Sequence, residues 1–294
     1  MARYITPNTS KVLKSFLTDC IVRQLAENTI QGYSYNLGRF IDWAGDPEII
    51  EVDPNLLRQY IQHLQETNHN PGGVHLHYRF LRTWLLWWEN ETDGDYRSPT
   101  HKVKAPKRSN EPMDPVDLDD VSALLKTCDH TYYGLRDRAL ITIMVDTGSR
   151  ATELLEVTVD KVDRVMGSIT VLGKGSKTRT LYMGTTARKA LRRWMQVHPG
   201  ASFLFTDSTR KQGLGYHGLR HMLKKRANLA GVPTPKTHAF RRAYALSMLR
   251  AGTDIFTLAK LLGHRNTRTL EHYIKLDYSD MELAQRNNSV ADRL

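Results

Sequence analysis

The first hundred residues carry apolar side chains at the spacing that is typical of amphipathic helices. Helices are predicted from Thr9 or Ser10 through Gln24, from about Thr29 to Trp43, after Asp53-Pro54, and after Pro71-Gly72-Gly73 as far as Trp88. Asp53 suits an N-cap because its carboxylate can accept hydrogen bonds from a first helical turn, and proline is favoured at the position that follows. The last segment has a broad apolar face, expected to pack in a core, made of Phe80, Leu81, Trp84, Leu85, Trp87 and Trp88. The pattern predicts an all-α N-terminal domain.

The rest of the chain mixes helical periodicity with short strand-like runs. Helices are predicted from Asp117 to Cys128, from Leu135 to Asp146 before Thr147-Gly148, from Arg150 behind a Ser149 cap, and again from Thr186. The strand-like runs are Glu156–Val159, Ser168–Leu172 and Thr178–Met183. The last two are joined by the glycine-rich segment 173–177, which suits a hairpin turn. We therefore expect a second domain that is mainly α-helical with a small antiparallel β-sheet.

Composition narrows the class of protein. With 294 residues, 40% of them hydrophobic, the chain is long enough for two domains with separate cores. Cys20 and Cys128 form no CxxC pair, which excludes a disulfide framework and a thiolate zinc module and fits a reducing cytoplasm. His75 and His77 lie two positions apart on a predicted helix and face different directions, so no metal site is expected. No apolar run is long enough to span a bilayer, so no membrane association is expected.

The net charge of +11, from 42 Lys+Arg against 31 Asp+Glu, indicates a polyanionic partner. Residues up to Ala105 hold 11 basic and 12 acidic side chains, whereas the remainder holds 31 and 19. Between the two parts, segment 99–108 contains two prolines that disfavour a helix. Its cations are Lys102, Lys104, Lys107 and Arg108. We interpret 99–108 as an interdomain linker that touches an anion, between domains 1–98 and 109–294; a solvated tether is the alternative.

Two predicted helix starts could together bind an anion. Thr237 suits an N-cap, which places His238 and Arg241 three positions apart on one helix face. Arg150 begins another helix, where Glu153 could orient its guanidinium. Cations at the positive end of a helix dipole are unfavourable without an anion, and a phosphodiester in its transition state spreads extra negative charge over its oxygens. Each motif alone is also compatible with ordinary exposed residues.

Two further segments carry candidate chemistry. The hairpin turn displays Lys174, but it is no P-loop, since GxxxxGK[ST] is absent and a strand follows. Gly263 suits a helix C-cap just before His264, and Tyr273 follows on a short predicted helix. A tyrosine, whose pKa is ordinarily about 10, needs a base and nearby positive charge to act as a nucleophile, and His238 could be that base. Tyr278 is a competing candidate.

These motifs, in this order, resemble the tyrosine recombinase (phage integrase) family. They are Thr147-Gly-Ser-Arg150 with Glu153, Gly173-Lys174-Gly, His238-x-x-Arg241, Leu262-Gly-His264 and Tyr273. The resemblance spans about residues 118–278, and the helical N-terminal part is similar to the family's core-binding domain, a SAM-like helical bundle. Ser149 stands where leucine is common in the family.

The resemblance implies a site-specific DNA recombinase that works without a cofactor, metal or ATP. Tyr273 would attack a phosphodiester to give a 3′-phosphotyrosyl link and a free 5′-hydroxyl. Arg150 and Arg241 would clamp the phosphate, with Glu153 in support. Lys174 would be the general acid for the departing 5′ oxygen, His238 a base or acid toward the tyrosine, and His264 a hydrogen-bond donor to the phosphate.

The resemblance also implies double-stranded DNA as the partner, a homotetramer on two DNA sites, and an accessory directionality factor as a further candidate partner. We expect a simple recombinase of Xer-like or Cre-like size without an arm-binding domain, acting on cytoplasmic DNA, and a helix opening at Ser279 that docks on a neighbouring subunit. The expected DNA contacts are Arg79, Arg82, Lys102, Lys104, Lys107, Arg108, Lys177, Arg179 and Arg242. A type IB topoisomerase and a non-catalytic DNA-binding regulator of the same fold remain as alternatives.

Overall fold

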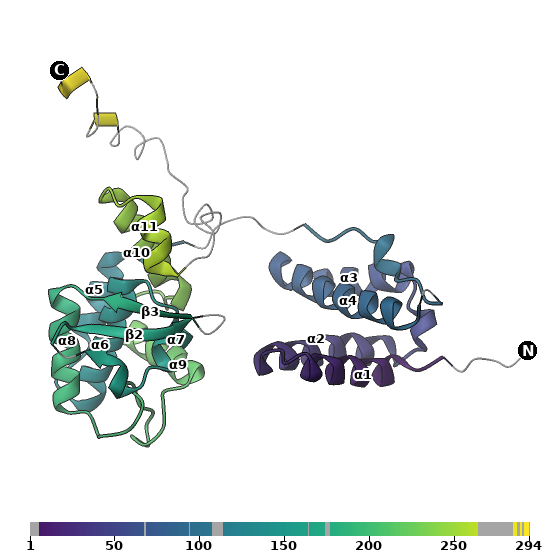
Figure 1. Ribbon diagram of the computed structural model, residues 1–294, viewed down its shortest axis with the longest axis horizontal. Coiled ribbons are helices and arrows are strands. Elements are labelled where there is room, and N and C mark those ends of the chain that lie inside the picture. The colour runs from purple at the N-terminus through teal and green to yellow at the C-terminus, as the bar shows by residue number, and fades with distance from the viewer. Residues whose placement is uncertain are drawn as a thin grey trace, which may run out of the picture. The chain divides into compact units, whose positions relative to one another are not determined.

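The computed structural model describes residues 6–67, 69–93, 95–107, 114–163, 165–173, 177–263, 285–286, 289 and 291–293. The chain divides into two compact units, Met1–Glu111 and Pro112–Leu294 (Figure 1). Each unit has its own hydrophobic core. Within the described ranges, no helix has both the length and the apolar character needed to cross a membrane.

The N-terminal unit is a helical bundle, as the sequence predicts. Its α-helices are α1 (Thr9–Val22), α2 (Glu27–Ala44), α3 (Pro54–Glu66) and α4 (Pro71–Glu91), with short 3-10 helices at Ile49–Glu51 and Pro99–His101. Aromatic rings fill its core: Trp84 is fully buried, and Phe40 meets Tyr60 edge to face at 5.1 Å. The predicted packing role of the α4 apolar face is confirmed, since Leu81, Trp84 and Leu85 are buried and Trp87 and Trp88 pack against the same core.

The helix starts of this unit test the predicted caps. Asp53 accepts a hydrogen bond from the backbone N–H of Leu56 at 2.7 Å, so the predicted N-cap of α3 is confirmed. The predicted Thr9 or Ser10 cap is wrong, because Asn8 occupies the N-cap position of α1. The hydroxyls of Thr9 and Ser10 bind the carboxylate of Asp46 instead.

The first half of segment 99–108 packs on the N-terminal unit. Val103 is 6% exposed and belongs to the core of this unit, where the hydroxyl of Tyr78 donates to its carbonyl at 2.6 Å. Arg58 donates to the carbonyl of Lys102 at 3.3 Å. The compact N-terminal unit therefore extends past residue 98, because Val103, an apolar side chain between the two prolines of the segment, reaches its core. Arg108 lies outside the described residues.

The C-terminal unit combines helices with a small antiparallel sheet in the order β1-β2-β3. Its elements are α5 (Leu118–Lys126), α6 (Tyr132–Thr147), α7 (Ala151–Leu155), a 3-10 helix (Val159–Lys161), β1 (Val162–Asp163), β2 (Ser168–Gly173), β3 (Lys177–Tyr182), α8 (Thr185–Gln196), α9 (Tyr216–Ala230), α10 (Thr237–Arg250), α11 (Ile255–Leu262) and a 3-10 helix (Ala291–Arg293). The predicted strand Glu156–Val159 is wrong: Thr158 makes only an isolated bridge with Phe203. The other two predicted strands are confirmed within about one residue.

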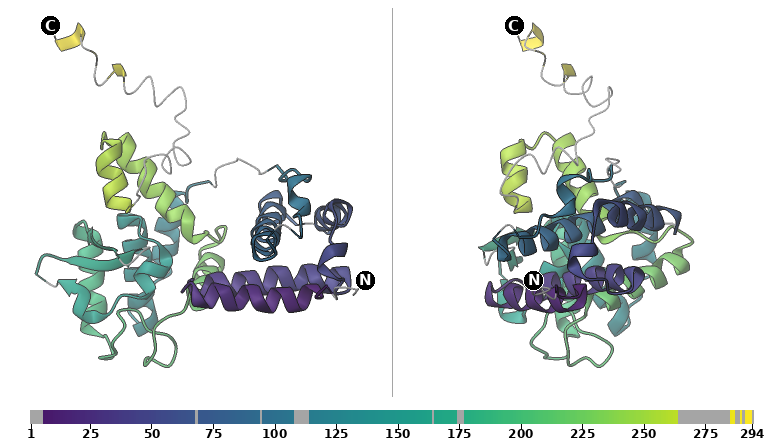
Figure 2. Two further views of the ribbon diagram at one scale, coloured as in Figure 1. Left: turned by 45° about the vertical axis from the view of Figure 1, so that its right-hand side comes forward. Right: turned by 90° about the vertical axis from the view of Figure 1, so that its right-hand side faces the viewer.

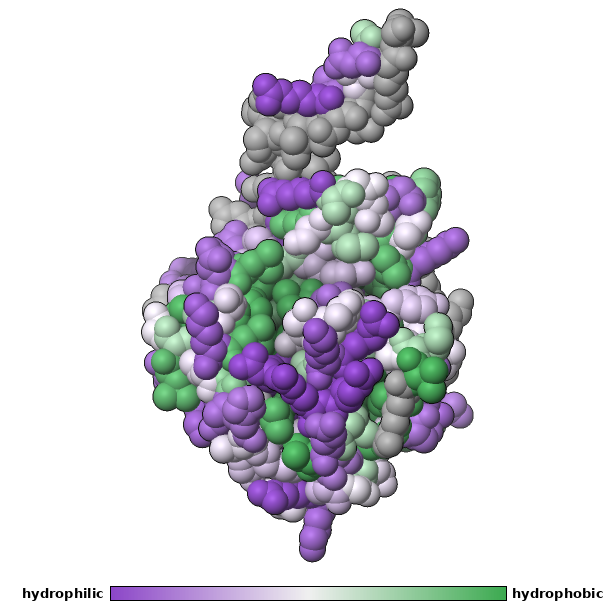
Figure 3. Space-filling model, turned by 90° about the vertical axis from the view of Figure 1, so that its left-hand side faces the viewer, coloured by the Kyte–Doolittle hydropathy of each residue, from purple (hydrophilic) through white to green (hydrophobic). Residues whose placement is uncertain are grey.

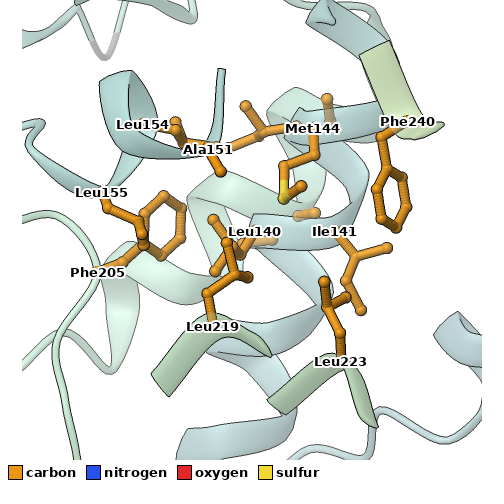
Figure 4. Packing of buried hydrophobic residues seen from close by; sticks show 14 of the residues in the cluster. Leu140, Ile141, Met144, Ala151, Leu154, Leu155, Phe205, Leu219, Leu223 and Phe240 are labelled. Carbon is orange, nitrogen blue, oxygen red and sulfur yellow. The ribbon is translucent and has the colours of Figure 1, made fainter. Parts of the chain in front are cut away.

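Helix α6 lies at the centre of this unit. Its apolar side chains are buried around the helix rather than along one stripe, which is typical of a helix surrounded by others. Figure 4 shows Leu140, Ile141 and Met144 packed among side chains of α7, α9 and α10. Helix α8 instead is amphipathic, with Leu191 and Trp194 buried. Figure 3 looks onto the side of the unit that carries α8 in Figure 1 and shows hydrophilic side chains gathered there.

A buried ion network ties α6 to α9. One carboxylate oxygen of Asp137 accepts from Nε and Nη2 of Arg136 at 3.0 and 2.7 Å, and the other accepts from Nε and Nη2 of Arg226 at 2.9 and 2.7 Å. All three residues are at most 6% exposed. Two guanidinium groups thus share a single carboxylate inside the unit.

Candidate active site

A pocket of about 200 Å³ lies where the turn between α6 and α7 meets the starts of α9 and α10. Its lining residues are Ser149, Arg150, Ala151, Thr152, Tyr216, Thr237, His238 and Arg241. The structure therefore brings together three of the predicted site residues, Arg150, His238 and Arg241, although up to 91 positions separate them in the sequence.

The start of α10 positions His238 and Arg241. Thr237 is the first residue of the helix rather than its N-cap, a position taken by Lys236 without a side-chain hydrogen bond. The predicted N-cap at Thr237 is therefore displaced by one residue. The hydroxyl of Thr237 lies 3.2 Å from the hydroxyl of Tyr216. His238 and Arg241 still share a face because three positions separate them.

Arg241 is held inside the domain. It is 1% exposed, and its Nη1 and Nη2 atoms donate to the carbonyls of Gly148 and Leu262 at 2.9 and 2.7 Å. The guanidinium thus joins the C-terminal ends of α6 and α11, and helix carbonyls at such ends attract cations. Figures 1 and 2 show α10 and α11 side by side. Leu262 is buried in a small cluster with Ala245 of α10.

Glycine is required at position 148. Its φ of +57° is in the left-handed region, as the C-cap of α6 demands. A Cβ at this position would also lie 2.5 Å from Cδ1 of Tyr244 and 2.9 Å from Cδ2 of Leu262. The turn that presents Arg150 can therefore lie close against α10 and α11 only because residue 148 has no side chain.

Arg150 is oriented by Glu153, as predicted. The backbone N–H of Arg150 donates to Oε2 of Glu153 at 3.2 Å, and its guanidinium bonds Oε1. Arg150 itself occupies the N-cap position of α7, so the predicted Ser149 cap is wrong. Ser149 is 1% exposed, and its hydroxyl has no hydrogen-bond partner among the described residues.

Glu153 is buried between two arginines. Its Oε2 also accepts from Nη2 of Arg179 at 2.7 Å. Burial alone would raise the pKa of this carboxyl, but the hydrogen bond from Arg150 and the charge of Arg179 outweigh it and hold the pKa below its usual value. Glu153 is therefore ionised at neutral pH and fixes both guanidinium groups.

Arg179 is engaged inside the domain, although the sequence suggests it as a DNA contact. Only 12% of its side chain is exposed, and its Nη1 donates to the carbonyl of Leu261 at 2.6 Å. One signal could have indicated this position: Arg179 is two residues from the buried Leu181 on β3, and such residues share a strand face.

The electrostatics of the pocket favour a neutral His238. Desolvation lowers the pKa of this histidine below its ordinary value of 6.5, and the positive charges of Arg241 and Arg150 lower it further. The residue is nevertheless exposed toward solvent. The ring can therefore exchange a proton with a group that enters the pocket.

A larger basic cleft of about 560 Å³ adjoins this pocket and shares Tyr216, Thr237 and His238 with it. It is lined by Tyr216, His217, Arg220, His221, Lys224, Thr234, Pro235, Lys236, Thr237 and His238. The spacing i, i+3, i+4 and i+7 places four of its α9 side chains on one helix face, namely His217, Arg220, His221 and Lys224. Sequence reasoning missed this face, although the spacing is visible within residues 216–230.

The remaining predicted residues fall into four groups. Exposed side chains suited to contact a partner are those of Arg79, Arg82, Lys102, Lys104 and Lys107. Arg242 is 7% exposed, so its place inside the domain argues against the predicted DNA contact. Lys177 begins β3, but its side chain is not described. Outside the described residues lie Lys174, His264, Tyr273, Tyr278, Ser279 and Arg108. In the part of the chain that the structure describes, no three His, Cys, Asp or Glu side chains gather to hold a metal ion.

Comparison with known protein families identifies both units. The model of the phage integrase family matches residues 115–280, more than half of the chain, and that of the phage integrase N-terminal SAM-like domain matches residues 12–86. The chain belongs to the phage integrase family. It is a tyrosine-type site-specific DNA recombinase, as the order of its motifs predicts.

Individual relatives agree with this assignment. The tyrosine recombinase XerD of Listeria monocytogenes is 29% identical over 289 residues, which cover 92% of this chain and 96% of the relative. The tyrosine recombinase XerC of Xanthomonas campestris is 26% identical over 89% of this chain and 82% of its own length.

Solved structures share the fold. XerH bound to its palindromic difH substrate has a TM-score of 0.71 at 18% identity, covering 97% of this chain and 85% of that one. A lambda integrase (75–356) dimer bound to a core site has a TM-score of 0.75 at 14% identity, covering 89% and 97%. At this identity the similarity concerns the fold, which consists of the predicted helical domain and a mainly helical domain with a three-stranded antiparallel sheet.

Proposed function

We propose that this recombinase cuts a DNA strand by attack of Tyr273 on a phosphodiester, with the phosphate held by Arg150 and Arg241. The attack gives a 3′-phosphotyrosyl link and a free 5′-hydroxyl, and the 5′-hydroxyl of a partner strand then reverses it. Because the phosphotyrosyl bond retains the energy of the broken bond, no ATP or metal is needed. The observation that carries this proposal is the convergence of Arg150, His238 and Arg241 on one pocket.

The pocket supplies what the transition state requires. Five oxygens surround phosphorus at the transition state, and the additional negative charge is stabilised by fixed donors that need no reorganisation. Arg241 and Arg150 are fixed in this way, the first by two helix carbonyls and the second by Glu153. The N-terminus of α10 adds the positive end of a helix dipole at the same place.

The remaining roles rest on the family motifs at matching positions. His238 acts as a base or acid toward Tyr273, and its lowered pKa keeps the ring able to accept a proton at neutral pH. Lys174 is the general acid that protonates the departing 5′ oxygen. His264 donates a hydrogen bond to the phosphate.

The cleft beside the pocket supports double-stranded DNA as the substrate. Four basic side chains of α9 and Lys236 line it, and it is continuous with the pocket through His238. A polyanion that enters the cleft therefore also reaches Arg150 and Arg241. We propose that four copies act together on two DNA sites in the cytoplasm, as strand exchange requires, with a directionality factor as a candidate partner.

A nicked suicide substrate tests the proposal. The unmodified protein should form a covalent adduct with the DNA, whereas Tyr273→Phe should lose the adduct and retain DNA affinity, because only the nucleophilic oxygen is removed. Tyr278→Phe is the matched control and should keep the adduct. Loss of the adduct in Tyr278→Phe together with its retention in Tyr273→Phe would contradict the assignment of the nucleophile.

The type IB topoisomerase alternative is separable on the same protein. A recombinase yields exchanged strands only when two sites are supplied, whereas a topoisomerase relaxes a supercoiled circle with a single site. Relaxation of one-site plasmids without exchange between two-site substrates would favour the alternative.

A further inference from the structure

The guanidinium of Arg179 links segments that each lead to a proposed catalytic residue. Through Nη2 it bonds Oε2 of Glu153, which orients Arg150. Through Nη1 it bonds the carbonyl of Leu261, in the last turn of α11, three positions before His264. Arg179 itself lies on β3, five positions after Lys174 in the sequence. Arg179 thus connects Glu153 to the end of α11.

The contacts around Arg179 are close. Gly263, the C-cap of α11, has a φ of +66°, and a Cβ on it would lie 2.8 Å from Cδ of Arg179. The side chain therefore passes directly over the end of α11. Arg241 bonds the neighbouring carbonyl of Leu262, so two guanidinium groups hold the two last residues of this helix.

We propose that Arg179 is a positioning residue that sets the geometry of Arg150 through Glu153 and holds the end of α11, and that it makes no contact with DNA. This inference rests on the proposed function, because it assigns Arg179 to the same reaction. An arginine is required, since its planar fork presents several donors at fixed angles, whereas a lysine offers one ammonium that cannot reach both acceptors in the same geometry.

Two quantities separate this role from a phosphate contact. A side chain that neutralises one phosphate contributes about 0.9 to the slope of log affinity against log salt concentration. A positioning residue contributes nothing to that slope but controls the cleavage rate at saturating DNA, where misplacement of a catalytic group costs about 10- to 100-fold.

The experiment compares Arg179→Lys and Arg179→Gln with Arg193→Gln, a control on the exposed face of α8. Single-turnover formation of the phosphotyrosyl adduct is measured at saturating DNA, and affinity is measured over a range of salt. We expect cleavage to slow about 10- to 100-fold in Arg179→Gln and less in Arg179→Lys, with affinity within about twofold and an unchanged salt slope. The control should match the unmodified protein.

Two further readouts depend on Glu153. Glu153→Gln combined with Arg179→Gln should be little slower than the slower single variant, because Arg179 acts partly through Glu153. Removal of the Arg179 charge also raises the pKa of Glu153, so the acidic limb of the cleavage profile should move to higher pH. If Arg179→Gln does not fold, Arg179→Lys, which retains the charge but not the paired hydrogen bonds, still allows the cleavage rate and the salt slope to be compared with those of the unmodified protein.

Each contrary result has a separate meaning. Unchanged cleavage at saturating DNA in both Arg179 variants overturns the inference. A salt slope reduced by about 0.9 also overturns it, because Arg179 would then contact a phosphate. If the unmodified protein forms no adduct at all, the proposed function fails and the inference fails with it.

Discussion

Cations of the C-terminal unit occupy two different environments. Arg136, Arg226 and Arg179 are engaged by buried carboxylates inside the domain. Arg220 and Lys224 of α9 instead lie exposed along the cleft beside the pocket. Net charge counts both groups equally, but only the second can neutralise a ligand. The comparison shows that the charge available to DNA depends on which cations are exposed rather than on the composition of the domain.

The largest effect is expected from a substitution that breaks the buried ion network around Asp137. Asp137→Asn removes the negative charge that Arg136 and Arg226 share and leaves two buried guanidinium groups without a counter-ion from this carboxylate. Removing one partner of a buried ion pair costs about 3–5 kcal/mol in the free energy of unfolding. The temperature at which the C-terminal unit unfolds should therefore fall by roughly 10 °C or more.

Asp160→Asn is the matched control for this prediction. Asp160 pairs with Lys161 on the surface, where both side chains are more than half exposed. Exposed pairs contribute little to stability, so this variant should unfold close to the unmodified protein. Equal unfolding temperatures for Asp137→Asn and Asp160→Asn would show that the buried network adds no stability beyond a surface pair.

Residues near in sequence explain the parts of the fold that could be predicted. Asp53, Gly148 and Gly263 mark helix ends through contacts with their own helices, and all three ends are where the sequence places them. Thr9 and Ser10 are suited to capping by composition, but Asp46, more than 35 positions away, binds both hydroxyls. The strand expected at Glu156–Val159 likewise forms only one bridge, between Thr158 and Phe203, which lies far away in the sequence.

The same distinction applies to the site. Arg150 and His238 could be predicted because a glycine turn and a proline-rich segment mark the helix starts that carry them. The role of Arg179 could not, since its partners Glu153 and Leu261 lie 26 and 82 positions away. Arg242 is a predicted DNA contact, but it is buried, and burial is a property of the folded domain that its residue type does not reveal.

An intermediate effect is expected at two adjacent lysines of α9, only one of which lines the cleft. Lys224 and Lys225 are adjacent and both exposed, but only Lys224 lines the cleft. Lys224→Ala should weaken DNA binding and reduce the slope of log affinity against log salt by about 0.9, whereas Lys225→Ala should change neither. Equal losses in the two variants would mean that DNA is attracted by the net charge and does not enter the cleft.

The smallest expected effect concerns the proton on His238. Partial desolvation and the charges of Arg241 and Arg150 lower its pKa below 6.5, so the imidazole is neutral at pH 7 and protonates only as the pH falls further. If neutral His238 is the base, cleavage should be nearly constant from pH 7 to 8 and decline only in more acidic solution. NMR titration of the ring measures this pKa directly.

Two changes should move this pKa upward for one electrostatic reason. Inorganic phosphate bound between Arg150 and Arg241 offsets their positive charge, and Arg150→Gln removes one of the two charges. Both should therefore raise the pKa of His238, and the phosphate effect should be weaker in Arg150→Gln because the anion loses a ligand. A pKa that responds to neither change would separate His238 electrostatically from the arginines, and the pocket would then not act as one phosphate site.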